Sequence, residues 1–69
     1  MKMEWLDGFV IKAVAEKGEI VISANREGLL SLAAHMVLLA NEETGSHIHY
    51  DDANSLENGS AELIIERIQ

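Results

Sequence analysis

The sequence predicts an α+β domain in which one helix packs on a small, mostly antiparallel sheet, with the element order β-β-α-β-β. Three observations lead to this fold class. Two segments rich in β-branched residues flank a glycine turn, a leucine-rich segment of helical periodicity follows, and two further alternating segments flank a loop of turn-forming residues. Such a helix and such strands bury their apolar sides most simply against each other. With 69 residues, the chain is expected to be a single domain over residues 1–69.

The first two strands are expected to form a hairpin. Residues 9–15 and 19–24 carry the β-branched residues, and Gly18 supplies a permissive backbone for the turn between them. The opening segment MKMEWL alternates as well, so the first strand can begin early and bend at Asp7-Gly8. The side chains predicted to face inward are Phe9, Ile11, Ala13, Ala15, Ile20, Ile22 and Ala24.

A helix is predicted from about residue 26 to residue 41. Asn25 can cap its first turn, where Glu27 is favourably placed for the helix dipole. On a helical wheel, Ser31 and His35 lie on the side opposite the apolar residues. His35 is therefore predicted to face solvent and to have no role in a site. The predicted buried face consists of Leu29, Leu32, Ala33, Met36, Val37 and Ala40, flanked by Leu30 and Leu39.

The last two strands are predicted at residues 47–50 and 61–68, on either side of a loop with Asn58-Gly59 as its strongest turn signal. Both faces of the final strand are partly apolar, which predicts that it is central in the sheet or covered on both faces. One helix covers one face of a sheet, and the other face would then expose Val10, Val14 and Val21. An apolar patch of this kind is typical of an interface, so we expect a homodimer through that face or through a strand edge.

The charge of the chain is −7 and is concentrated in its C-terminal part. Residues 1–41 contain five acids and four bases, a net −1, whereas residues 42–69 contain seven acids and one base, a net −6. Such a field repels nucleic acid and attracts a basic protein. The absence of cysteine excludes disulfides and thiolate zinc sites. Without a signal peptide or a membrane-length apolar segment, a soluble cytoplasmic protein is expected.

The stretch SHIHYDD contains the residues best suited to bind a metal ion or to take part in catalysis. Alternation along a strand would put His47, His49 and Asp51 on one face, and two imidazoles with a carboxylate suit zinc, nickel or ferrous iron. A His49–Asp51 acid–base pair is excluded, because same-face residues two apart are separated by roughly 7 Å. The interpretation favoured from the residues alone is structural. Asp51 and Asp52 would accept backbone hydrogen bonds in Asx turns, and a histidine would pair with a carboxylate.

A longer set of residues resembles a known family. The run from Gly45 to Asp51 and the ending Glu62-Leu63-Ile64-Ile65-Glu66, with Asn54, Leu56 and Gly59-Ser60 between them, is similar to the signature of small bacterial immunity proteins of polymorphic toxin systems. The helix start Glu27-Gly28-Leu29-Leu30 resembles that family too, and the likeness covers roughly residues 20–68. Tyr50 departs from the pattern, which more often has an aliphatic residue there. The resemblance implies a non-enzymatic protein that neutralises a cognate toxin by binding it.

Partner-binding or loop-organising roles are therefore predicted for five residues, and no catalytic residue, metal or cofactor is predicted. Two alternatives stay open: a small metal-binding module built on the two histidines and Asp51, and an oligomeric accessory domain whose function is assembly. The candidate residues are His47, His49, Asp51, Asp52 and Glu57.

Overall fold

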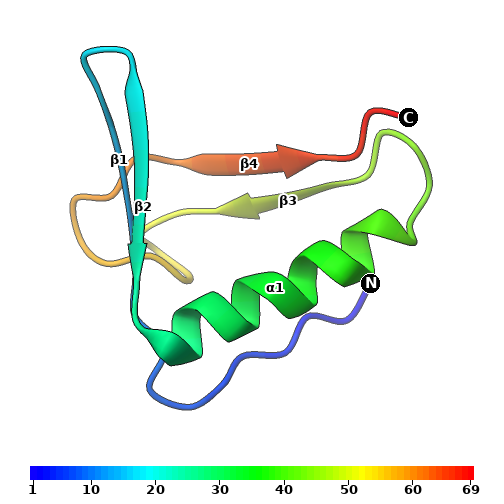
Figure 1. The fold of residues 1–69 in the computed structure, drawn as a ribbon, viewed down its shortest axis with the longest axis horizontal. Coiled ribbons are helices and arrows are strands. Elements are labelled where there is room, and N and C mark those ends of the chain that lie inside the picture. Colours follow the sequence, from blue (N-terminus) through cyan, green and yellow to red (C-terminus); the bar gives the residue numbers. More distant parts are fainter.

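The computed structural model describes all of residues 1–69 and contains one helix and four strands (Figure 1). In chain order the elements are β1 (Ile11–Glu16), β2 (Glu19–Ala24), α1 (Arg26–Ala40), β3 (His47–Tyr50) and β4 (Leu63–Glu66). The predicted α+β class and β-β-α-β-β order are confirmed. The strands do not join into one sheet, however, but form two separate antiparallel pairs, β1-β2 and β3-β4. The helix lacks the length and apolar character that crossing a membrane requires.

The β1-β2 hairpin is anchored at its base and projects beyond the rest of the molecule at its tip (Figure 1). Lys17 and Gly18 both have positive φ, 52° and 78°, as the favoured two-residue hairpin turns require. At the base, Ile11 is fully buried and enters the core. Towards the tip, Ile20 is 74% exposed and Ile22 40% exposed. The prediction that these two isoleucines face the core is therefore wrong. Ala13, opposite Ile22, is buried, so the core covers β1 at this level but leaves the outer strand β2 exposed.

The loop between β3 and β4 joins the two sheets by covering the free edge of β1. The backbone N–H of Glu57 donates to the carbonyl of Ile11 at 2.9 Å, and that of Ala61 donates to Ala13 at 2.8 Å. The hydroxyl of Ser60 accepts from the N–H of Ala13 at 3.2 Å. The prediction for the last strand is wrong in both of its forms. β4 is not central, because it pairs only with β3, and one of its faces is uncovered, since Ile64 is 57% exposed.

Residues 1–9, the N-terminal segment, run along α1 instead of extending β1 (Figure 1). The chain bends at Asp7-Gly8, where Gly8 has a φ of 81°. Asn25 holds this bend against the helix. Its side-chain oxygen accepts from the N–H of Gly28 at 2.8 Å, which caps α1 as predicted, and from the N–H of Val10 at 2.9 Å. Its amide nitrogen donates to the carbonyl of Gly8 at 2.8 Å.

The N-terminal segment also reverses the predicted orientation of the helix. The residues of α1 that are buried are Gly28, Ser31, His35 and Leu39. Leu29 and Val37, which the wheel places in the core, are 55% and 64% exposed. The hydroxyl of Ser31 accepts from the backbone N–H of Leu6 at 2.9 Å, so this polar residue is satisfied where it is buried.

His35 is fully buried and links three parts of the chain, so its predicted exposure is wrong. Its Nε2 lies 2.7 Å from the carbonyl oxygen of Glu4 and its Nδ1 lies 2.9 Å from the hydroxyl of Tyr50. A carbonyl can only accept, so Nε2 carries the proton and Nδ1 accepts from Tyr50 in the neutral ring. Burial raises the pKa of Tyr50 to about 12, which keeps this hydroxyl protonated. Trp5 packs edge-on against the His35 ring, with centroids 4.4 Å apart.

The apolar core surrounds this polar contact. Its residues come from both sheets, the end of the helix and the loop after β3: Ile11, Ala13, Leu39, Ile48, Tyr50 and Leu56. No buried side-chain nitrogen or oxygen is left without a hydrogen bond.

Candidate functional site

The outer face of the β3-β4 sheet carries the two histidines of the SHIHYDD stretch. Along β3, Ile48 and Tyr50 are buried while His47 and His49 are exposed, as expected for a strand with one covered face. The register places Glu66 opposite His47 and Ile64 opposite His49. We call this surface the histidine face; its residues are His47, His49, Glu62, Ile64 and Glu66.

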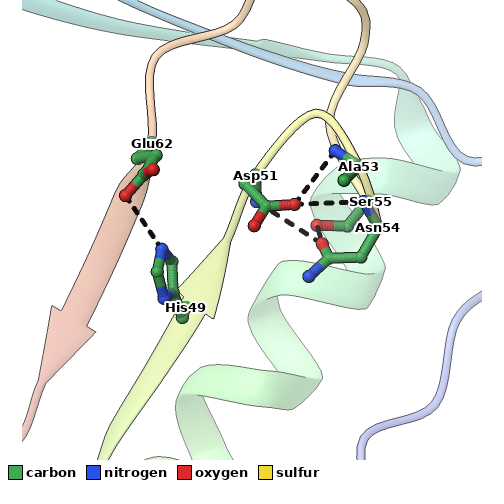
Figure 2. A network of polar contacts seen from close by, with 6 residues as sticks. All are labelled: His49, Asp51, Ala53, Asn54, Ser55 and Glu62. Atoms are coloured by element: carbon green, nitrogen blue, oxygen red, sulfur yellow. Dashed lines mark hydrogen bonds and ion pairs between the residues drawn. The ribbon is translucent and has the colours of Figure 1, made fainter.

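His49 is paired with a carboxylate on this face. Its Nε2 lies 3.1 Å from a side-chain oxygen of Glu62, and Figure 2 shows the two side chains reaching towards each other from neighbouring segments. This confirms the predicted histidine–carboxylate pairing. Both side chains are exposed, at 47% and 69%, so the pair adds only ~0–1 kcal/mol to stability. The fold does not depend on it, and its polar atoms remain accessible to a partner.

Asp51 is directed away from the histidines and into the following loop (Figure 2). Its carboxylate accepts from the backbone N–H groups of Ala53 and Asn54 at 3.0 and 3.1 Å. Its carbonyl accepts from the N–H groups of Ser55 and Leu56 at 3.1 and 2.8 Å. These contacts are the Asx-type hydrogen bonding expected for this aspartate. They turn the chain so that Leu56, 5% exposed, enters the core.

Asp52 and Glu57 are exposed on the same loop, and the structure gives neither carboxylate a hydrogen bond or an ion pair. The Asx hydrogen bonding predicted for Asp52 is therefore wrong, because the N–H groups of Ala53 and Asn54 donate to Asp51. The backbone of Glu57 holds the loop to β1, while its side chain is free of the fold. The structure thus brings His47 and His49 together, gives Asp51 a part in the loop, and leaves Asp52 and Glu57 as solvated charges. Their roles in partner binding stay predictions.

The histidine face includes three residues that the sequence did not single out as candidates: Glu62, Ile64 and Glu66. The signal that could have found them is the antiparallel pairing of HIHY with LIIE, which places β4 residues beside each histidine. That register depends on how the long loop turns, which no short-range pattern in the sequence specifies.

A metal site on this stretch would need ligands that converge. No group of three His, Asp or Glu residues is close enough together to hold a metal ion. We expect the purified protein to carry no stoichiometric transition metal, and a chelator to leave its melting temperature unchanged. About one zinc ion per chain by elemental analysis, with loss of stability on chelation, would instead establish the metal-binding alternative.

The surface hollows lie away from the histidine face. They have volumes of 290, 410 and 180 Å³ and are lined by residues of the hairpin, the N-terminal segment and α1. None includes His47, His49 or Asp51. Sites for small molecules are usually concave and enclosed, so this exposed sheet face suits the surface of another protein better.

The fold and this surface define a small acidic α+β protein that presents a polar sheet face beside an acidic loop. The model of the immunity protein 32 family, Imm32, matches residues 19–68, so the chain belongs to that family of immunity proteins. The match begins with β2 and includes α1, β3 and β4, which confirms the resemblance predicted from the signature residues. No curated protein and no solved structure gives a significant match.

Proposed function

We propose that the protein neutralises a cognate toxin by binding it directly through the histidine face and the adjoining acidic loop. The observation that carries this proposal is that the two faces of β3 and β4 differ: one face packs in the core and the other is exposed. The inward residues, Ile48 and Tyr50, build the core, whereas the outward histidines and Glu66 make no contribution to it. Exposed residues that the fold does not require are candidates for recognition.

The charge distribution supports a basic partner. Residues 42–69 carry the net −6, and that range contains β3, β4 and the loop that joins them. Complementary charge accelerates the encounter of two proteins, while exposed pairs at a rim add little to the affinity of the complex. A toxin with a basic surface would therefore be steered towards the histidine face.

Association kinetics test whether the acidic loop attracts the toxin electrostatically. Neutralising the exposed carboxylates in the double variant Asp52→Asn, Glu57→Gln should slow association with the toxin and flatten its dependence on salt, with little change in dissociation. The matched control is Glu4→Gln, Glu16→Gln, which makes the same change in charge at exposed side chains away from the loop. The measurement is surface plasmon resonance against the toxin at two salt concentrations. Equal slowing by both double variants would mean that only net charge matters.

Substitution of His49 by alanine tests contact at the centre of the face. If the complex desolvates His49, the lost hydrogen bond should cost ~1–3 kcal/mol and appear as faster dissociation. The exposed histidine can be removed without disturbing the core, so unfolding should be nearly unchanged. Dissociation that stays at the native rate for both His49→Ala and His47→Ala would place the toxin on another surface.

The homodimer expected from the sequence is a second proposal, and exposed apolar surface supports it. Val10 and Val21 are 43% and 47% exposed on the hairpin. On the opposite side of the hairpin, Ile20 is exposed as well. Surface of this kind on a small domain favours association.

A further inference from the structure

β2 is an open strand edge with apolar side chains on both of its faces. It pairs with β1 alone, and every residue from Glu19 to Ser23 is exposed. Ile20, Val21 and Ile22 are 74%, 47% and 40% exposed. The other edge of this sheet, that of β1, is covered by residues 57–61, so β2 provides the position where the sheet can grow.

The backbone of β2 is also oriented for pairing. Residues of an antiparallel pair alternate between bonding their partner strand and facing away from it. The carbonyls of Ile11 and Ala13 face away from β2, since they bind Glu57 and Ala61. Their cross-strand partners are Ala24 and Ile22, which consequently direct their N–H and C=O groups away from β1.

The features that usually protect an edge strand are missing here. The ladder runs without a bulge from Ile11–Ala24 to Glu16–Glu19. β2 contains no proline and no lysine, and its single charge, Glu19, lies at one end. A straight apolar edge of this kind is a template for another strand.

We propose that β2 pairs antiparallel with β2 of a second copy of this chain, with Ile22 opposite its own counterpart on the twofold axis. The two hairpins would form one four-stranded sheet. When a twofold axis perpendicular to the sheet relates two antiparallel strands, one residue lies opposite its own counterpart. If that residue is Ile22, the N–H and C=O groups that point away from β1 in each copy face each other and can form hydrogen bonds. This register also places Ile20 opposite Ala24 of the second copy, so the overlap extends over most of β2.

Charge favours a second copy over the basic toxin as the occupant of this edge. The hairpin carries Lys12, Glu16, Lys17 and Glu19, which sum to zero, so the whole −7 lies elsewhere in the chain. Two copies can therefore approach at the hairpin with the least mutual repulsion. In the proposed register Glu19 of the second copy lies opposite Asn25, the residue before Arg26, whose side chain is 77% exposed. A basic partner would be drawn to the acidic loop instead.

The inference gives the proposed homodimer a specific interface and does not depend on toxin binding. The histidine face belongs to the other sheet, so pairing through β2 leaves it accessible in both copies. Sedimentation of the protein alone tests the dimer, and toxin kinetics test neutralisation, so either proposal can fail without the other.

Sedimentation velocity and equilibrium from micromolar to near-millimolar concentration form the experiment. The native chain should be dimeric at the upper end. Ile22→Lys and Ile22→Glu should each raise the dimer dissociation constant by more than about tenfold, because like charges would meet at the axis. An equimolar mixture of the two variants should recover a heterodimer. Leu29→Lys, on the exposed side of α1, is the matched control and should dimerise as the native chain does.

Circular dichroism checks that each variant is folded, and Ile20→Lys, at a more exposed position, replaces Ile22→Lys if that variant unfolds. A native chain that stays monomeric up to near-millimolar concentration would overturn the proposal. Dissociation by Leu29→Lys in place of the β2 variants would also overturn it and move the interface to the helix. If the chain is monomeric and the β2 variants lose toxin binding, the edge belongs to the toxin and the proposal is likewise wrong.

Discussion

Replacement of His35 by leucine is expected to lower the free energy of unfolding by about 2–5 kcal/mol. Leucine can fill much of the space, but it removes both hydrogen bonds of the ring. The hydroxyl of Tyr50, which is fully buried, loses its acceptor, and a buried polar group left unpaired costs ~1–3 kcal/mol. The partly buried carbonyl of Glu4 also loses its donor, at a smaller cost because water can reach it. A single core of this size supplies only ~3–5 kcal/mol, so much of the protein should be unfolded at room temperature.

Denaturant titration monitored by fluorescence measures this effect. Trp5 is the only tryptophan, and it packs against His35 and Phe9, so its emission reports directly on the N-terminal segment. His47→Leu is the matched control, since the same substitution at an exposed histidine should change stability by less than ~0.5 kcal/mol.

A double-mutant cycle then isolates the contact between the ring and the phenol. Adding Tyr50→Phe to His35→Leu removes a hydroxyl that has already lost its acceptor, so the two costs should not add. Additive costs, or a His35→Leu variant as stable as the native protein, would contradict the role given to this contact.

The orientation of α1 is the part of the fold that local patterns could not predict. The helical wheel ranks Leu29 and Val37 above Ser31 and His35 for burial, because it considers side chains alone. The deciding partners are backbone groups of Glu4 and Leu6, which lie in a segment that alternates like a strand. Once these groups satisfy Ser31 and His35, burial of the polar stripe becomes favourable. The same segment lies before residues 19–68, where the family match is found.

Features set by neighbouring residues were predicted well. Asn25 caps the helix by accepting from the N–H of Gly28, three residues later in the chain. Asp51 likewise accepts from the N–H groups of the next few residues and so organises a turn. The inward position of Ile22 failed because it depends on which distant elements reach the hairpin. The docking of Glu57 on β1 was missed for the same reason, since no short-range pattern encodes a contact between segments so far apart in the chain.

For the candidate site, the sequence predicted the features that depend on local alternation but not those that depend on contacts between distant segments. The alternation of HIHY correctly separates His47 and His49 from the core, because the period of a strand is local. The neighbours of the histidines are β4 residues and Glu62, which directly precedes β4, and they lie across the longest loop of the chain. The sequence therefore identifies the face but not the carboxylates that share it. Glu62 illustrates the difference, since it becomes a neighbour of His49 only when the two strands pair.

The stability of the protein is expected to fall steeply between pH 10 and pH 12 because of Tyr50. Burial raises the pKa of Tyr50 from 10.0 to about 12 in the folded protein. The folded-state pKa is the higher one, so the stabilising contribution is fully present below pH 10. It is lost as pH rises towards 12, because the unfolded chain gives up the phenolic proton first. A difference of this size between the two pKa values makes about 3 kcal/mol of stability depend on pH.

Unfolding measured at a series of alkaline pH values tests this expectation, and the chain offers a direct spectroscopic readout. Tyr50 is the only tyrosine, so phenolate absorbance reports its ionisation alone. At pH 11 the folded protein should show little phenolate, and unfolding should release it. Tyr50→Phe is the control: it should be less stable at neutral pH, because the Nδ1 of His35 loses its donor, but its stability should change little between pH 10 and pH 12. If the native protein forms phenolate near pH 10 while still folded, Tyr50 is more hydrated than its burial and its contact with His35 imply.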